Sequence, residues 1–78
     1  MDKLINIDKK ILGGTPVFMG TRVPIETLFD HLEAGMSIDD FLQDFPTVQK
    51  EQAIKMVSFA GKLLSSKTII KEYENIAG

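Results

Sequence analysis

The sequence contains no cysteine and only one histidine, and both shortages narrow the ways in which the chain can be stabilised. Without cysteine, disulfide bonds and thiolate metal sites are excluded, and a single histidine argues against a histidine-rich metal centre. The 78 residues form one small domain, whose hydrophobic core is marginal by itself. Because such cores usually rely on disulfides, metal ions or oligomerisation, self-association is the support that remains. We expect no metal ion and no cofactor.

Long apolar segments are missing as well. The longest uninterrupted apolar run is far shorter than the about 20 residues of a membrane-spanning helix. The chain begins Met-Asp-Lys-Leu-Ile-Asn, which lacks the apolar region of a secretory signal. These observations predict a cytoplasmic protein that has no membrane partner.

A strong excess of basic residues is also absent, since the formal net charge is −2. Nucleic-acid-binding domains are usually basic, so the total charge does not indicate one. The charge is nevertheless unevenly distributed. Apart from His31, the charged residues of segment 30–44 are all acidic, whereas lysine and arginine occur on both sides of it.

The N-terminal third carries the signals of a β-hairpin or a pair of edge strands, followed by a helix. Residues 4–7 and 17–19 are short runs of strand-forming residues, and turn-forming residues separate them. We expect Pro24 at the first position of the helix and Gly35, in a left-handed conformation, just past its end. Apolar residues then recur with helical spacing on one face, at Ile25, Leu28, Phe29 and Leu32.

A second, short helix is expected after Ser37. Together with Asp40, this serine matches a capping box, and Pro46 ends the helix. A third helix is expected from Gln49 or Lys50 to about residue 64. Its expected inner face consists of Ala53, Met56 or Val57, Ala60, and Leu63 or Leu64.

These elements predict a mainly α fold: a helix-turn-helix-like three-helix bundle with a short N-terminal β element and a C-terminal helical appendage. A single domain is expected over residues 1–64. Within it, residues 1–23 form the hairpin arm and residues 24–64 form the helical bundle. Residues 65–78 form a tail, either frayed or folded as a short amphipathic helix.

The glycine-rich stretch GGTPVFMGTRVPI, residues 13–25, does not match a phosphate-binding P-loop. That loop needs Gly, four residues and then Gly-Lys-Ser/Thr, whereas five residues separate Gly14 from Gly20 and Thr21-Arg22 follow. Pro16 also removes a backbone N–H that such a loop would use. The glycines are therefore interpreted as turn residues. Two interpretations of Arg22 stay open, a structural anchor of the hairpin and a contact to a ligand or partner.

No catalytic set emerges from the sequence. Glu26, Asp30 and Glu33 follow one another on one face of the first helix, where exposed carboxylates are usually solvated. His31 has no cysteine or partner serine, so it is expected to pack at the surface or at the boundary of the core. We therefore do not expect an enzyme.

DNA binding is left open by the third helix. Glutamines near the start of a recognition helix contact base edges, and lysines contact phosphates. Against this, the acidic second helix would lie near the DNA backbone. The candidate DNA-binding residues are Gln49, Lys50, Gln52, Lys55 and Lys62.

Three segments together resemble the bacterial domain-of-unknown-function 433 family: GGTPVFMGTRVPI, LEAGMSIDDFLQDFP and VQKEQAIKMVSFA. The hallmark of that family is Gly-x-Pro-hydrophobic-x-x-Gly-Thr-Arg-hydrophobic-Pro, followed by Gly-x-Ser and an aromatic-Pro pair. The resemblance covers about two-thirds of the chain. The matching residues are Gly14, Pro16, Val17, Gly20, Thr21, Arg22, Val23, Pro24, Gly35, Ser37, Phe45 and Pro46. One departure is Gln49, because relatives usually start the third helix with threonine, which is a better N-cap.

The resemblance implies a helix-turn-helix-like bundle that often forms a homodimer. Many family members resemble antitoxins encoded beside a PIN-like ribonuclease toxin, so this chain is expected to mask such a toxin and to repress its own operon on double-stranded DNA. Two alternatives remain, a DNA-binding transcriptional regulator without a toxin and a homodimeric interaction module. The candidate partner-binding residues are Arg22, Lys67, Ile69, Lys71, Tyr73 and Ile76.

Overall fold

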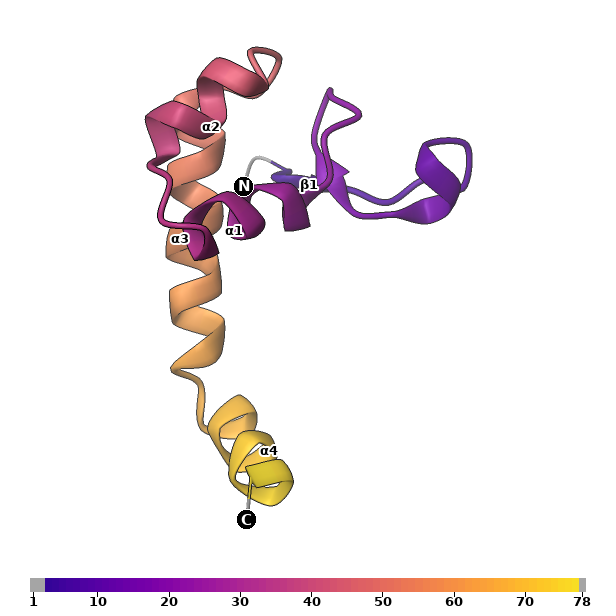
Figure 1. Ribbon diagram of the computed structural model, residues 1–78. Helices are drawn as coiled ribbons and strands as arrows, with labels where there is room; N and C mark the ends of the chain where they lie inside the picture. Colours follow the sequence, from indigo (N-terminus) through magenta and orange to yellow (C-terminus); the bar gives the residue numbers. More distant parts are fainter. Residues whose placement is uncertain (1–2, 78) are drawn as a thin grey trace.

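The computed structural model describes residues 3–77, and helices dominate it (Figure 1). The mainly α fold expected from the sequence is confirmed, with a small N-terminal sheet. In chain order the elements are β1 (Ile5–Asn6), the 3-10 helix η1 (Leu12–Gly14), β2 (Val17–Phe18), α1 (Ile25–Glu33), α2 (Ile38–Asp44), α3 (Lys50–Leu64) and α4 (Lys67–Ala77).

The two strands form the expected antiparallel hairpin, although each is shorter than its apolar run. Ile5 pairs with Phe18 and Asn6 with Val17. The loop between the strands contains η1 and projects away from the helices (Figure 1). Val17 also forms a β-bridge with Pro24, so the chain returns beside β2 before it enters α1.

This bridge corrects the expected position of Pro24. The proline precedes α1 as its N-cap, with extended backbone angles (φ −61°, ψ 140°), instead of occupying the first helical position. The backbone N–H of Ile25 donates to the carbonyl of Pro16 at 3.0 Å, which holds this segment extended. At the other end of α1, Gly35 has φ +83°, the expected left-handed conformation.

The capping box of α2 is confirmed. The backbone N–H of Asp40 donates to the hydroxyl of Ser37 at 3.0 Å, and that of Ser37 donates to the Asp40 carboxylate at 3.0 Å. The backbone and side-chain hydrogen bonds from Ser37 lower the pKa of Asp40 below its usual range. Two N–H groups that the helix leaves without partners are thereby satisfied.

The core lies where the hairpin meets α1, α2 and the first half of α3. Phe18, Leu28 and Phe41 are fully buried, and the Phe18 and Phe41 rings are 5.9 Å apart between centroids. These contacts join the sheet to α2. The other residues of the buried cluster are Val23, Val48, Ala53 and Met56.

The second half of α3 extends beyond this core, and α4 lies at its far end, away from the hairpin (Figure 1). The segment for which a frayed tail or a helix was expected is helical over Lys67–Ala77. Within residues 3–77, none of the helices has the length and apolar character needed to cross a bilayer.

Candidate functional site

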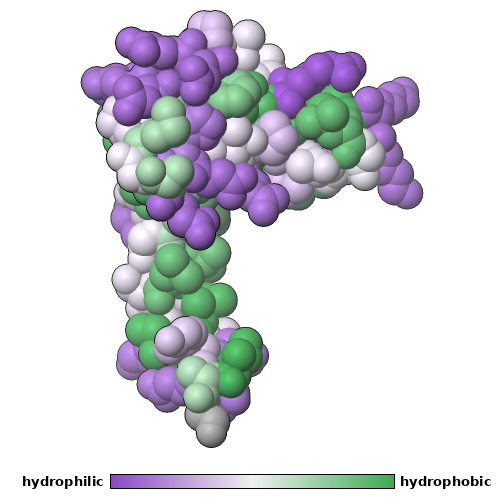
Figure 2. Space-filling view, in the orientation of Figure 1, coloured by the Kyte–Doolittle hydropathy of each residue, from purple (hydrophilic) through white to green (hydrophobic). Residues whose placement is uncertain are grey.

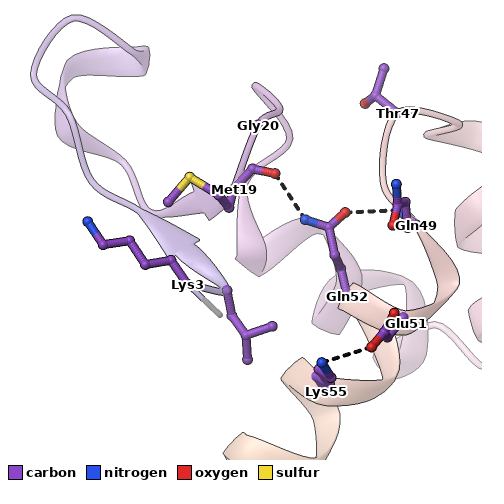
Figure 3. A pocket seen from close by; sticks show the side chains of 9 residues that line it. Lys3, Met19, Gly20, Thr47, Gln49, Glu51, Gln52 and Lys55 are labelled. Carbon is purple, nitrogen blue, oxygen red and sulfur yellow. Dashed lines mark hydrogen bonds and ion pairs between the residues drawn. The ribbon is translucent and has the colours of Figure 1, made fainter. Parts of the chain in front are cut away.

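The first candidate surface is the start of α3, where Gln49 and Gln52 were expected to contact DNA bases. The Gln52 carbonyl oxygen accepts from the backbone N–H of Gln49 at 2.9 Å (Figure 3). Its amide nitrogen donates to the backbone carbonyl of Met19 at 2.9 Å, a contact between the hairpin and α3. Gln52 therefore satisfies the backbone N–H of Gln49, the N-cap residue, and α3 begins at Lys50. In this structure its side chain is already committed to two protein groups.

The candidate lysines on this face are also engaged. Lys50 Nζ lies 3.3 Å from Asp39 Oδ1, and Lys55 Nζ lies 2.8 Å from Glu51 Oε1. The hydrogen bond and charge of Lys55 lower the pKa of Glu51. Exposed ion pairs of this kind contribute little stability, but they do balance the positive charge. Lys62 is exposed on the half of α3 that extends past the core. DNA binding by these residues stays a prediction.

A hollow of about 330 Å³ lies between the hairpin and the start of α3 (Figure 3). The Gln52–Met19 hydrogen bond crosses between its two sides, and the Lys55–Glu51 ion pair lies at α3. Among residues 3–77, no buried side-chain polar atom lacks a hydrogen-bond partner. The lining residues are Lys3, Leu4, Met19, Gly20, Thr47, Gln49, Glu51, Gln52 and Lys55.

Arg22 lies in the loop after β2, and its side chain is exposed. Within the described residues no hydrogen bond or ion pair engages its guanidinium, so the anchor interpretation gains no support there. Thr21 anchors the loop. Its hydroxyl donates to the carbonyl of Phe18 at 2.9 Å and accepts from the backbone N–H of Val23 at 3.0 Å. The Gly-Thr pair before the arginine was the signal for such a side-chain-stabilised turn.

Another candidate surface, here called the C-terminal arm, consists of residues 59–77. Apolar side chains gather on it, from the lower part of α3 to α4 (Figure 2). The expected burial of Leu63 or Leu64 is wrong, since both are exposed, at 46% and 64%. The core ends before these residues, and their apolar stripe continues without a covering element. The exposed large apolar residues of the arm are Phe59, Leu63, Leu64, Ile70, Tyr73 and Ile76.

On α4, the expected partner-binding residues separate onto different faces. Ile69, Tyr73 and Ile76 follow helical spacing and share one face, with Ile69 partly buried and the other two exposed. Ile70 adjoins them and was missed by the sequence reasoning. Lys67 and Lys71 are one helical turn apart, and each is two residues from Ile69, so both lie on the opposite face.

His31 packs at the boundary of the core, as expected. Its ring lies edge-on to the rings of Phe41 and Phe45, at centroid distances of 5.4 and 5.6 Å. The hydrogen bond to the Thr27 carbonyl raises its pKa most, and the bond to Asp44 adds to the effect. Among residues 3–77, no group of three or more histidine, cysteine, aspartate or glutamate side chains is arranged to hold a metal ion.

Comparison with known proteins places the chain in a family. An uncharacterised protein of Sinorhizobium fredii (strain NBRC 101917 / NGR234), y4eO, is 36% identical to it over 50 residues. The match covers 64% of this chain but only 23% of that relative. No solved structure matches. The model of the family described as "Protein of unknown function (DUF433)" matches residues 5–60, which include the hairpin, the core and most of α3. The chain therefore belongs to the DUF433 family.

Proposed function

We propose that this protein is an antitoxin-like regulator whose C-terminal arm binds and masks a partner protein, a PIN-like ribonuclease toxin. One observation carries the proposal: the apolar stripe of α3 continues past the end of the core and is taken up by α4. Ala53 and Met56 are buried on this stripe, whereas Leu63 and Leu64 are exposed on it.

Exposed apolar surface of this extent favours a protein partner. Leu64, Tyr73 and Ile76 are 64%, 69% and 84% exposed. Soluble monomers rarely leave apolar patches of more than a few hundred Å² in water, and larger patches mark interaction sites. An amphipathic helix binds an apolar groove through anchors spaced like Ile69, Tyr73 and Ile76. Burial of these side chains stabilises a complex at about 25 cal/mol per Å² before the entropic cost of association.

The charge of the arm adds a reason for the nuclease partner. A metal-dependent nuclease holds its ions with carboxylates, so its active site is acidic. Lys67 and Lys71 lie together on the polar face of α4, from which their long side chains can reach such carboxylates at the rim of the contact.

Operator binding is the second part of the expected antitoxin activity, and it stays a separate prediction. The helix-turn-helix-like order of α2 and α3 favours it. The ion pair between Lys50 and Asp39 and the committed side chain of Gln52 count against it. Binding of the chain to its own upstream double-stranded DNA would weaken steeply with added salt.

The test is co-expression of the tagged chain with the product of the neighbouring open reading frame, followed by mass measurement of the purified material. A stoichiometric complex with a nuclease that is toxic when expressed alone supports the proposal. Tyr73→Lys with Ile76→Lys is expected to abolish the complex, and Lys67→Glu with Lys71→Glu to weaken it. Asn75→Lys, which lies away from Ile69 and Tyr73 on the helix and adds no negative charge, is expected to leave it intact.

Two outcomes contradict the proposal. If the chain elutes only with itself, a homodimeric interaction module replaces the antitoxin. If the complex forms but tolerates Tyr73→Lys with Ile76→Lys, the arm is not the binding surface.

A further inference from the structure

The loop that carries Arg22 is held rigidly by its own hydrogen bonds. The backbone N–H of Phe18 donates to the carbonyl of Val23 at 3.0 Å, and that of Thr21 donates to the carbonyl of Phe18 at 3.0 Å. The Thr21 hydroxyl closes the loop from inside, and Gly20 supplies the left-handed turn with φ +80°. With Phe18 and Val23 buried at its two ends, the loop presents Arg22 from a fixed base.

Arg22 lines a hollow of about 600 Å³ on the outer side of this loop. Of the described residues that line the hollow, Arg22 is the one that carries a charge. Ile11 and Val23 add apolar surface, and Asn6 and Thr47 add neutral polar groups. The full lining is Asn6, Ile11, Gly20, Thr21, Arg22, Val23 and Thr47.

We propose that this hollow binds a single carboxylate presented by a polypeptide, the side chain of an aspartate or glutamate in an extended segment. A guanidinium donates two parallel hydrogen bonds that match the geometry of a carboxylate. One positive charge balances one carboxylate, and within residues 3–77 no acidic side chain lines the hollow to compete for it. The apolar walls at Ile11 and Val23 suit an apolar residue next to the acid.

The shape of the surface favours a polypeptide over a small acid. Gly20 and Thr47 line both this hollow and the one between the hairpin and α3. The two hollows are therefore neighbours, and together they offer a continuous path along the hairpin for several residues of an extended chain. The C-terminal arm lies at the far end of α3 (Figure 1), so this site and the arm are separate and neither depends on the other.

The experiment selects a phage-displayed library of short random linear peptides on the full-length folded chain. We expect the enriched peptides to share an aspartate or glutamate beside an apolar residue. The best peptide is then synthesised with its acid and, as a matched probe, with the corresponding amide. The amide version is expected to bind the wild type at least about tenfold more weakly than the acidic peptide does. The acidic peptide is expected to bind Arg22→Gln with the same loss of affinity. Arg22→Lys retains the charge but loses the paired donors, and binds with intermediate affinity.

Lys62→Gln, which removes an exposed cation from α3, is the control and is expected to bind like the wild type. Thermal melting checks that Arg22→Gln is folded, as its exposed side chain leads us to expect. The proposal is overturned if no peptide is enriched, if enriched peptides lack an acid, or if Arg22→Gln binds them equally well. Binding of sodium acetate is measured from the NMR shift of the Arg22 Nε–H group. If acetate binds as tightly as the peptide, the inference that the ligand is a polypeptide is overturned.

Discussion

His31 on α1 and Asp44 on α2 are joined through Nε2 and Oδ2 at 3.1 Å, thirteen residues apart in the sequence. The other ring nitrogen, Nδ1, lies 2.8 Å from the carbonyl oxygen of Thr27. A neutral imidazole has one N–H and can donate only one of these two bonds. Protonated His31 donates both, so the contact between α1 and α2 is complete only when this side chain is charged.

This arrangement predicts that stability falls as the pH rises. The pKa of His31 is raised above its ordinary value of 6.5, so the folded protein holds this proton more tightly than the unfolded chain does. The resulting stability is complete below pH 6.5 and is lost as the pH rises through the higher pKa of the folded state. Urea midpoints measured from about pH 5.5 to about pH 8.5 will show the fall.

Two variants test the assignment. In His31→Gln the fall is expected to disappear, and in Asp44→Asn to shrink, because the Thr27 carbonyl still favours the charged ring. A fall of unchanged size in His31→Gln would assign the effect to another group.

Replacement of Ser37 by alanine is expected to destabilise the protein by about 1 kcal/mol, since it removes one side of the capping box of α2. Ser58→Ala is the control, because that serine is exposed within α3 and alanine favours helix. Chemical denaturation at neutral pH measures both. Equal midpoints for the two variants would show that the Ser37 hydroxyl contributes nothing to stability.

Gln52→Ala is expected to cost about 1–2 kcal/mol, because the Met19 carbonyl and the Gln49 N–H both lose a partner. Gln52→Glu separates the two bonds. Its carboxylate still accepts from Gln49, but it places an acceptor against the carbonyl of Met19. We expect amide exchange in the hairpin to accelerate in both variants. Gln43→Ala, at an exposed position on α2, is the control and should match the wild type. If amide exchange in the hairpin of Gln52→Glu is as slow as in the wild type, Gln52 does not bridge the hairpin and α3.

Leu28→Ala and Leu64→Ala remove the same atoms from opposite environments. Leu28 is fully buried, so its truncation is expected to cost about 2–5 kcal/mol, a large share of the stability of a small domain. Leu64 is mostly exposed, so its truncation is expected to leave the melting temperature of the isolated chain unchanged. A comparable loss in Leu64→Ala would mean that the arm is covered in solution, and sedimentation would then identify a dimer.

Local signals in the sequence were sufficient for most of the fold. The spacing of Ile25, Leu28 and Leu32 predicted α1, and the pairing of Ser37 with Asp40 predicted the start of α2, because both depend on neighbours within one or two helical turns. The left-handed Gly35 follows from the same local logic. Pro24 was misplaced by one residue because its extended backbone depends on a bridge to Val17, which lies in another element.

The candidate site was less predictable, because it depends on contacts between distant segments. Periodicity assigned Leu63 or Leu64 to an inner face, but it carries no information about where the covering elements end. The position of Gln52 near the start of α3 indicated a contact to DNA bases. Its hydrogen bond to Met19 joins residues 33 positions apart and has no local signal. Arg22 was left between two interpretations, although the Gly-Thr pair before it was a local signal for a turn that Thr21 stabilises.

The position of α3 has one further consequence. It is a single helix, yet its first half belongs to the core and its second half to the C-terminal arm. Helix formation is cooperative, so a ligand that orders the second half of α3 also lowers the entropic cost of ordering the first half. A ligand of the arm therefore raises the free energy of unfolding of the whole domain by mass action. The lifetime of this small protein in a cell, in the face of proteolysis, is thereby linked to the concentration of whatever occupies its arm.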